Sequence, residues 1–126
     1  MRFFYLFFIF ICFCSTCFAA SAKEMCAGAK MAAKQQNAKA PYKVNKNTEL
    51  IEMRVNCKYK TIFTIKVIID KKYLPNGWIE IMQKRHTKMN CSKKGLAGGF
   101  GWTATSNIYD KNSNHIAIIS TTPKDC

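Results

Sequence analysis

The sequence has few acidic residues, only two histidines and no pair of cysteines at the close spacing of zinc ligands. Seven acids stand against 20 lysines and arginines, which gives the 126-residue chain a formal net charge of +13. Without a C-x-x-C spacing, and with both histidines far from any cysteine pair, the common zinc sites lack their ligands. No apolar stretch after residue 22 could span a membrane, and no repeat or linker divides the chain. We therefore predict one small domain with no metal and no cofactor.

The N-terminal residues have the pattern of a secretory signal peptide. Arg2 is followed by an uninterrupted apolar run to Phe13, and Ala20-Ser21-Ala22 offers the small residues that a signal peptidase needs. We predict a signal peptide at residues 1–22 and a single mature domain at residues 23–126. Cleavage after Ala19 is also allowed.

Two other uses of this N-terminal segment remain open. Its apolar run approaches the lower limit of a membrane anchor, which needs roughly 17–25 residues. A lipidated cysteine would follow an aliphatic residue and a small one, whereas Cys17 follows Cys14-Ser15-Thr16. The sequence therefore favours cleavage over anchoring or lipidation, and it predicts a periplasmic or secreted protein.

The cysteines predict disulfides in the mature domain. Three of the seven lie in the predicted signal peptide, which leaves four. An even number in an exported chain is typical of disulfide bonding, and four cysteines allow three pairings. We favour Cys26 with Cys57 and Cys91 with Cys126, because each pair then lies within one half of the chain. Metal ligation is the competing interpretation.

The mature chain remains strongly basic. Only Arg2 leaves with the signal peptide, so the net charge falls from +13 to +12. Of the 20 basic residues of the full chain, 17 are lysines, and they are scattered as on a solvated surface. We predict weak attraction to anionic surfaces that is screened by salt, and no specific binding of nucleic acid.

The first half of the mature chain indicates a helix followed by two strands. Residues 23–40 are rich in alanine, lysine and glutamine, and Pro41 ends the helix. Residues 37–47 are mostly polar, and we predict that they connect the helix to the first strand. From Thr48 apolar and polar residues alternate to residue 56, and again over residues 63–69. These two strands are expected to form an antiparallel hairpin.

The second half indicates another helix and another hairpin. Apolar residues at spacings of three and four predict a helix from Trp78 to Met89, with Asn76 as a plausible N-cap. Residues 95–101 contain four glycines but match no phosphate-binding loop, so they are expected to permit a turn or a close approach of two backbones. Two strands, at 100–109 and 115–120, are then joined by a polar turn.

The order helix, hairpin, helix, hairpin predicts an α+β domain that is held together by disulfides. Its simplest form is a four-stranded antiparallel sheet with both helices on one face. The predicted core combines alternate strand residues with the apolar side of the second helix: Ile51, Met53, Val55, Phe63, Ile65, Val67, Trp78, Ile81, Trp102, Ile108, Ile116 and Ile118.

No catalytic motif rises above background. His86 and His115 together would suit a ribonuclease-like acid and base, but nothing in their spacing brings the rings together. Most of the acids lie beside lysines or in turns, where a structural role explains them, and the four mature cysteines are better used as disulfides. We expect a protein that is not an enzyme and has no small-molecule substrate.

Several short patterns resemble a family of exported bacterial proteins. They are Val55-Asn56-Cys57, Gly101-Trp102-Thr103, Ile108-Tyr109-Asp110 and the final Pro123-Lys124-Asp125-Cys126. The arrangement is similar to the S-beta pilotins of type II secretion, which are periplasmic α+β domains that bind and guide a secretin subunit. The resemblance implies a protein partner in the cell envelope. This chain departs from pilotins in its lipidation signal, and no binding residue can be transferred.

Two functions therefore follow as expectations. The first is a periplasmic, non-enzymatic binding protein that accompanies a secretion or envelope assembly. The alternative is an immunity or inhibitor protein that neutralises a toxin or lytic enzyme, because small size, export and disulfides suit it equally well.

Overall fold

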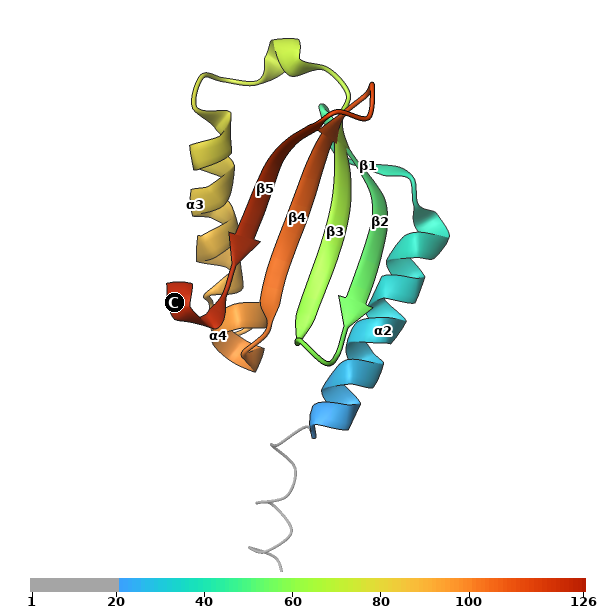
Figure 1. Cartoon of the computed structure of the whole chain (residues 1–126), viewed down its shortest axis with the longest axis vertical. Coiled ribbons are helices and arrows are strands. Elements are labelled where there is room, and N and C mark those ends of the chain that lie inside the picture. Colours follow the sequence, from blue (N-terminus) through green and yellow to red (C-terminus); the bar gives the residue numbers. More distant parts are fainter. Residues whose placement is uncertain (1–20) are drawn as a thin grey trace, which may run out of the picture.

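The computed structural model describes residues 21–126, so nearly all of the predicted signal peptide lies outside it. The chain forms a five-stranded sheet (Figure 1). Along the sequence, one long helix precedes the first strand, and two further α-helices connect the third strand to the fourth. The elements are α2 (Ala22–Lys39), β1 (Tyr42–Asn45), β2 (Thr48–Asn56), β3 (Thr61–Ile68), η1 (Lys71–Tyr73), α3 (Trp78–Asn90), α4 (Leu96–Phe100), β4 (Thr103–Asp110), β5 (His115–Thr121) and η2 (Pro123–Asp125).

The sheet is mixed, and its strand order is β1-β2-β3-β4-β5. The predicted α+β class and both hairpins are confirmed, but the four-stranded antiparallel sheet is wrong in two ways. The segment expected to be a polar connection contains β1, which pairs with the start of β2. In addition, β3 and β4 run parallel, from Thr61 opposite Thr103 to Ile68 opposite Asp110. A parallel pair needs a crossover connection, and α3 with α4 provides it.

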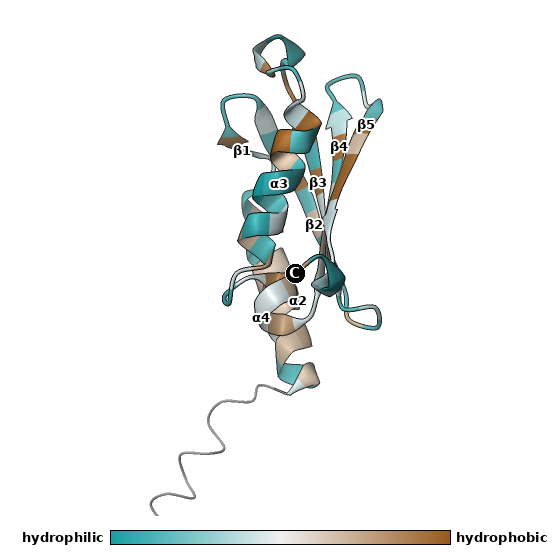
Figure 2. Cartoon of the chain, turned by 90° about the vertical axis from the view of Figure 1, so that its left-hand side faces the viewer, coloured by the Kyte–Doolittle hydropathy of each residue, from teal (hydrophilic) through white to brown (hydrophobic). Residues whose placement is uncertain are grey.

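The helices leave one face of the sheet bare. Helix α3 lies beside β5, and α2 runs along β2 at the other side of the sheet (Figure 1). Seen from the side, α3 and α4 lie on one face of the sheet, and within residues 21–126 no helix lies on the opposite face of β3, β4 and β5 (Figure 2). The face under α3 is therefore the buried one, and between α2 and α3 part of it stays open.

The core lies under α3. A buried cluster consists of Ile68, Ile108, Ala117 and Ile119. Partly buried side chains pack against it from α3 and the segment before it (Leu74, Trp78 and Met82) and from β5 (Ile116). Among the predicted core residues only Trp102 and Ile108 are fully buried.

For β3, and for Ile118 on β5, the prediction chose the wrong side of the strand, whereas Met53 and Val55 on β2 lie opposite Thr64 and Ile62 on the covered face. Phe63, Ile65 and Val67 lie on the bare face and are only partly buried, and Ile118 there is 58% exposed. The core is filled instead by residues whose side chains point to the other face of these strands, such as Ile62, Ile68 and Ile119. The reason is that β3 and β5 are apolar on both sides, so alternation alone does not identify the covered face.

Amide side chains from the two long helices cap the open edges of the sheet. On β2, beyond the short β1, Asn37 accepts from the Met53 N–H at 2.7 Å and donates to its carbonyl at 2.8 Å. On β5, Gln83 donates to the Ser120 carbonyl at 2.8 Å and accepts from its N–H at 3.3 Å. Each amide takes the place of a neighbouring strand, which protects an edge that could otherwise pair with another chain.

The glycine-rich segment forms a short helix rather than a loop leading directly to a strand. Gly95 is the N-cap of α4, and Gly101 ends it with a φ of 70°. A Cβ on Gly98 would lie 2.3 Å from the carbonyl oxygen of Cys91, so the expected close approach of two backbones is present. The predicted N-cap of α3 is wrong: Gly77 occupies that position in the left-handed conformation, without a side-chain cap.

Two disulfides close the chain, Cys26–Cys57 and Cys91–Cys126, with Cα separations of 5.6 and 5.2 Å. These are the two pairs that the local-pairing argument favours. The first joins the start of α2 to the turn after β2, and the second joins the end of α3 to the last residue. Such bonds persist in an oxidising, exported environment. Among residues 21–126, no helix has the length and apolar character needed to cross a membrane.

Candidate functional site: a groove between helix α3 and the sheet

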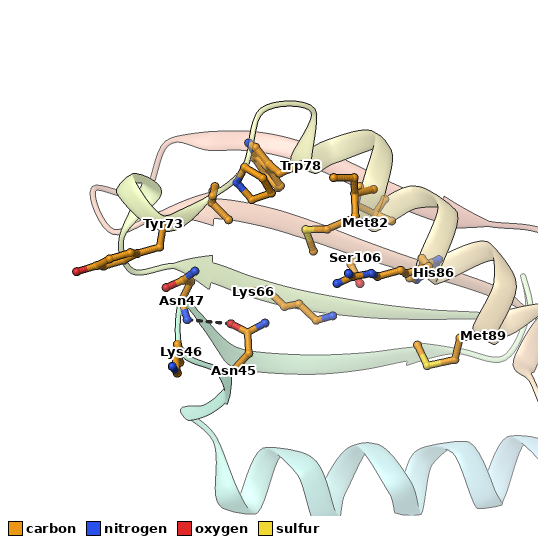
Figure 3. Close-up of a pocket in the computed structure, with 15 residues that line it drawn as sticks. Asn45, Lys46, Asn47, Lys66, Tyr73, Trp78, Met82, His86, Met89 and Ser106 are labelled. Atoms are coloured by element: carbon orange, nitrogen blue, oxygen red, sulfur yellow. Dashed lines mark hydrogen bonds between the residues drawn. The ribbon is translucent and has the colours of Figure 1, made fainter.

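A groove of about 690 Å³ opens between α3 and the β1–β2 turn (Figure 3). Its volume lies in the range of roughly 300–1,000 Å³ that is usual for ligand pockets. The groove exists because α3 covers β4 and β5 while α2 covers only the edge of β2, so that the sheet between them is open. Its residues come from the β1–β2 turn, the segment before α3, α3 itself and strands β3, β4 and β5: Asn45, Lys46, Asn47, Lys66, Tyr73, Leu74, Pro75, Trp78, Ile81, Met82, Arg85, His86, Met89, Ser106 and Ile119.

The wall on the α3 side is mainly apolar. Trp78, Ile81, Met82 and Met89 recur at helical spacing, so they share one side of the helix. Trp78 and Met82 also pack on the core, whereas Ile81 is 38% exposed and Met89 67% exposed. The sequence predicted this helix side as core, and the structure divides it between core and groove. Exposed methionines suit a binding surface because their side chains adapt to a partner.

The floor contains an isolated cation. Lys66 lies in the middle of β3, and its side chain extends along the floor between Ser106 and Met89 (Figure 3). Its ladder partners are Leu50 on β2 and Ile108 on β4, which are 5% and 0% exposed. Burial lowers the pKa of Lys66. Among the described residues, no carboxylate oxygen lies within 4.0 Å of its ammonium group.

His86 lies beside this cation on the groove wall. Its Nδ1 is 2.7 Å from the Oγ1 of Thr121, a residue with no exposed surface. Burial lowers the pKa of His86, and the nearby charge of Lys66 lowers it further. Both effects favour the neutral ring, and the Thr121 hydroxyl fixes its orientation.

The two histidines do not share a site. His115 stacks edge-on against Tyr109, with ring centroids 5.1 Å apart, and Tyr109 lines a shallow depression on the bare face with Phe63 and Ile65. His86 is on the opposite, covered face. The sheet therefore separates the two rings, which excludes a reaction that needs both of them.

Most of the acids have structural partners. Glu52 pairs with Arg54 on the surface, Asp70 accepts from the Lys72 N–H, and Asp125 forms a capping box with Thr122. Asp110 organises the β4–β5 turn by accepting from the N–H groups of residues 112 and 114. Among residues 21–126, no group of three or more His, Cys, Asp or Glu side chains could hold a metal ion.

Comparison with solved structures shows a similar architecture in three other proteins. A Pseudomonas aeruginosa protein that is thought to be secreted matches with a TM-score of 0.62 and 15% identity, over 86% of this chain and 99% of that chain. The type II secretion system pilotin AspS of Vibrio cholerae matches at 0.60 and 11% identity, over 83% and 94%. The fold is pilotin-like. The Vibrio vulnificus pilotin EpsS, also of a type II secretion system, matches at 0.56 and 11% identity, over 78% and 90% of the two chains.

The likeness is one of fold. No protein-family model matches the sequence, and no curated protein matches it significantly. The predicted resemblance to pilotins is thus confirmed at the level of structure. At this identity, no functional residue of the pilotins can be assigned to a position in this chain. Sequence reasoning missed the groove and Lys66. The signal that could have identified Lys66 is its position between Ile65 and Val67, in the most apolar strand of the chain.

Proposed function

We propose that this protein is an exported, non-enzymatic binding protein that accompanies a secretion or envelope assembly, and that the α3 groove holds an apolar segment of its protein partner. The pilotin-like fold and the two disulfides support an envelope protein of this kind. The groove supports binding rather than catalysis, since the acids and histidines of the described residues are either dispersed or engaged in structural contacts.

The observation that most favours this function is the partly exposed apolar wall of α3. Ile81 and Met89 are large apolar side chains that face an open groove instead of the core. Burial of an apolar side chain contributes about 25 cal/mol per Å² of area removed from water. A partner segment that covers this wall would gain that energy without any rearrangement of the core.

Site-specific photo-crosslinking in the living cell tests the proposal. A photo-crosslinking amino acid replaces Met89 in the groove, and the matched control replaces Ile118, which is 58% exposed on the bare face. We expect one dominant adduct from position 89, with a secretion-system or outer-membrane protein, and no such adduct from position 118. The same adducts from both positions, or no dominant adduct from position 89, would contradict the proposal.

The identity of the adduct also separates the two expected functions. A toxin or lytic enzyme bound through position 89 would replace the secretion role with an inhibitor or immunity role. The neighbouring genes provide an independent check, because a secretion operon favours the first function and a toxin gene the second.

A further inference from the structure

Lys66 occupies a sheet position whose neighbours on the same face are buried apolar residues. On the same side of β3, Ile62 is 8% exposed and Ile68 is 1% exposed. Across the ladder, Lys66 lies between Leu50 and Ile108, both buried. Lysine can extend its apolar stem along a surface and keep its charge at the open end, as the side chain does here along the groove floor (Figure 3). The fold gains nothing from that charge, because an apolar side chain would fill the position as well.

The charge also lacks compensation within the groove. Among the described residues that line it, three are lysine or arginine, namely Lys46, Lys66 and Arg85, and none is aspartate or glutamate. His86 on the groove wall supplies no opposite charge, and the charge of Lys66 is the second cause, after burial, of its lowered pKa. A half-buried charge without a partner is costly, and the cost disappears when an opposite charge is placed against it. The groove is therefore complementary to a ligand that is apolar but has one negative group.

We propose that the groove selects a partner segment that is apolar except for one aspartate or glutamate, and that this carboxylate pairs with the ammonium group of Lys66. This inference rests on the proposed function and specifies the chemistry of the partner. The apolar residues of the segment cover Ile81, Met82 and Met89, while its acid reaches the floor. Lys66 then determines specificity, since an apolar segment without an acid would leave the cation buried and unpaired.

The test compares two variants that remove the same charge. Lys66→Met keeps the apolar stem, and Lys111→Met removes a lysine from the exposed β4–β5 turn. The ligand is the segment that crosslinks to position 89, prepared as a synthetic peptide, and affinity is measured by calorimetry. A hydrogen-bonded charge pair contributes enough that Lys66→Met should weaken binding roughly 10- to 100-fold. Lys111→Met should stay within about twofold of the wild type.

Two further measurements exclude a folding artefact. Lys66→Met should melt no lower than the wild type, because it replaces an unpaired cation with an apolar group. Replacing the acid of the peptide by its amide should weaken binding to the wild type but not to Lys66→Met. A melting temperature that falls together with the affinity would assign Lys66 a structural role and overturn the inference.

The remaining outcomes separate this inference from the proposed function. Unchanged affinity in Lys66→Met, together with loss of binding in Ile81→Asp, would leave the groove as the binding site but overturn the role of Lys66. A crosslinked segment without an acid would do the same. Binding of a fatty acid to the groove, with no binding of any captured peptide, would overturn both, as would the absence of a dominant crosslink at position 89.

Discussion

The side-chain amide of Asn37 pairs with both backbone groups of Met53, at 2.7 Å to the N–H and 2.8 Å to the carbonyl oxygen. The pair joins the end of α2 to the middle of β2, on the edge that β1 leaves uncovered. A single side chain thus supplies the two hydrogen bonds that a further strand would have made. It also fixes the position of α2 along the sheet, because the amide reaches only one residue of β2.

Loss of this contact should destabilise the domain. We predict that Asn37→Ala lowers the free energy of unfolding by about 1 kcal/mol. A typical net hydrogen bond contributes about 0.5–1.5 kcal/mol, and the two hydrogen bonds that are lost here are both exposed. The matched control is Gln35→Ala, another exposed amide on α2. Urea unfolding followed by circular dichroism gives both values. Equal stability of the two variants would show that the edge contact adds nothing.

The Cys91–Cys126 disulfide should contribute more than any single hydrogen bond. It links residues 35 positions apart and ties the C-terminal residue to the end of α3. Loss of a native disulfide from a small exported domain typically costs about 2–5 kcal/mol, and we expect this loss for Cys126→Ala. Thermal unfolding of the oxidised protein measures it.

A double variant serves as the control for the disulfide. Cys91→Ala with Cys126→Ala removes the same bond but leaves no free thiol to form wrong disulfides. Its melting temperature should fall as far as that of Cys126→Ala, while mispaired species should appear only in the single variant. An unchanged melting temperature in both would refute a stabilising role.

Asp110 should make stability depend on pH in the acid range. The N–H of Asn114 donates to its Oδ1 at 2.9 Å, and this bond is the main reason why the pKa of Asp110 falls to about 2. The Asn114 side chain, Lys71 and the Asn112 N–H act in the same direction. Because the pKa is lower in the folded state, the carboxylate stabilises the fold above its unfolded pKa of about 4.

This contribution should disappear as the pH falls toward 2. Asp110→Asn is therefore expected to destabilise the domain clearly at pH 6 and little at pH 2. Glu80→Gln, which removes one negative charge from the first turn of α3, is the matched control. Denaturant unfolding at pH 2, 3, 4 and 6 tests the difference. A constant gap between Asp110→Asn and the wild type across this range would contradict the assigned role.

Local features of the chain were enough to predict the order of its elements. The alanine-rich run before Pro41 predicted α2, and the apolar spacing from Trp78 to Met89 predicted α3. Each predicted end lies within one residue of the observed end. The alternating runs predicted two hairpins, and the positions of the four cysteines favoured the pairs that the structure contains. These properties depend on near neighbours in the sequence, through propensity, periodicity and loop length.

The arrangement of the sheet depended on contacts between distant segments. The parallel pairing of β3 with β4 and the choice of covered face arise only when α3 crosses over and docks on β5. Strand β3 offers apolar side chains on both sides, so its alternation was compatible with either face. The docking of α3 buried Ile68 and left Phe63 on the bare side. It also placed Lys66 in the groove, as the only lysine that the strands of the described residues contribute to it. A two-residue alternation contains no information about which side of the strand a helix will cover, and that is why the groove became visible only in three dimensions.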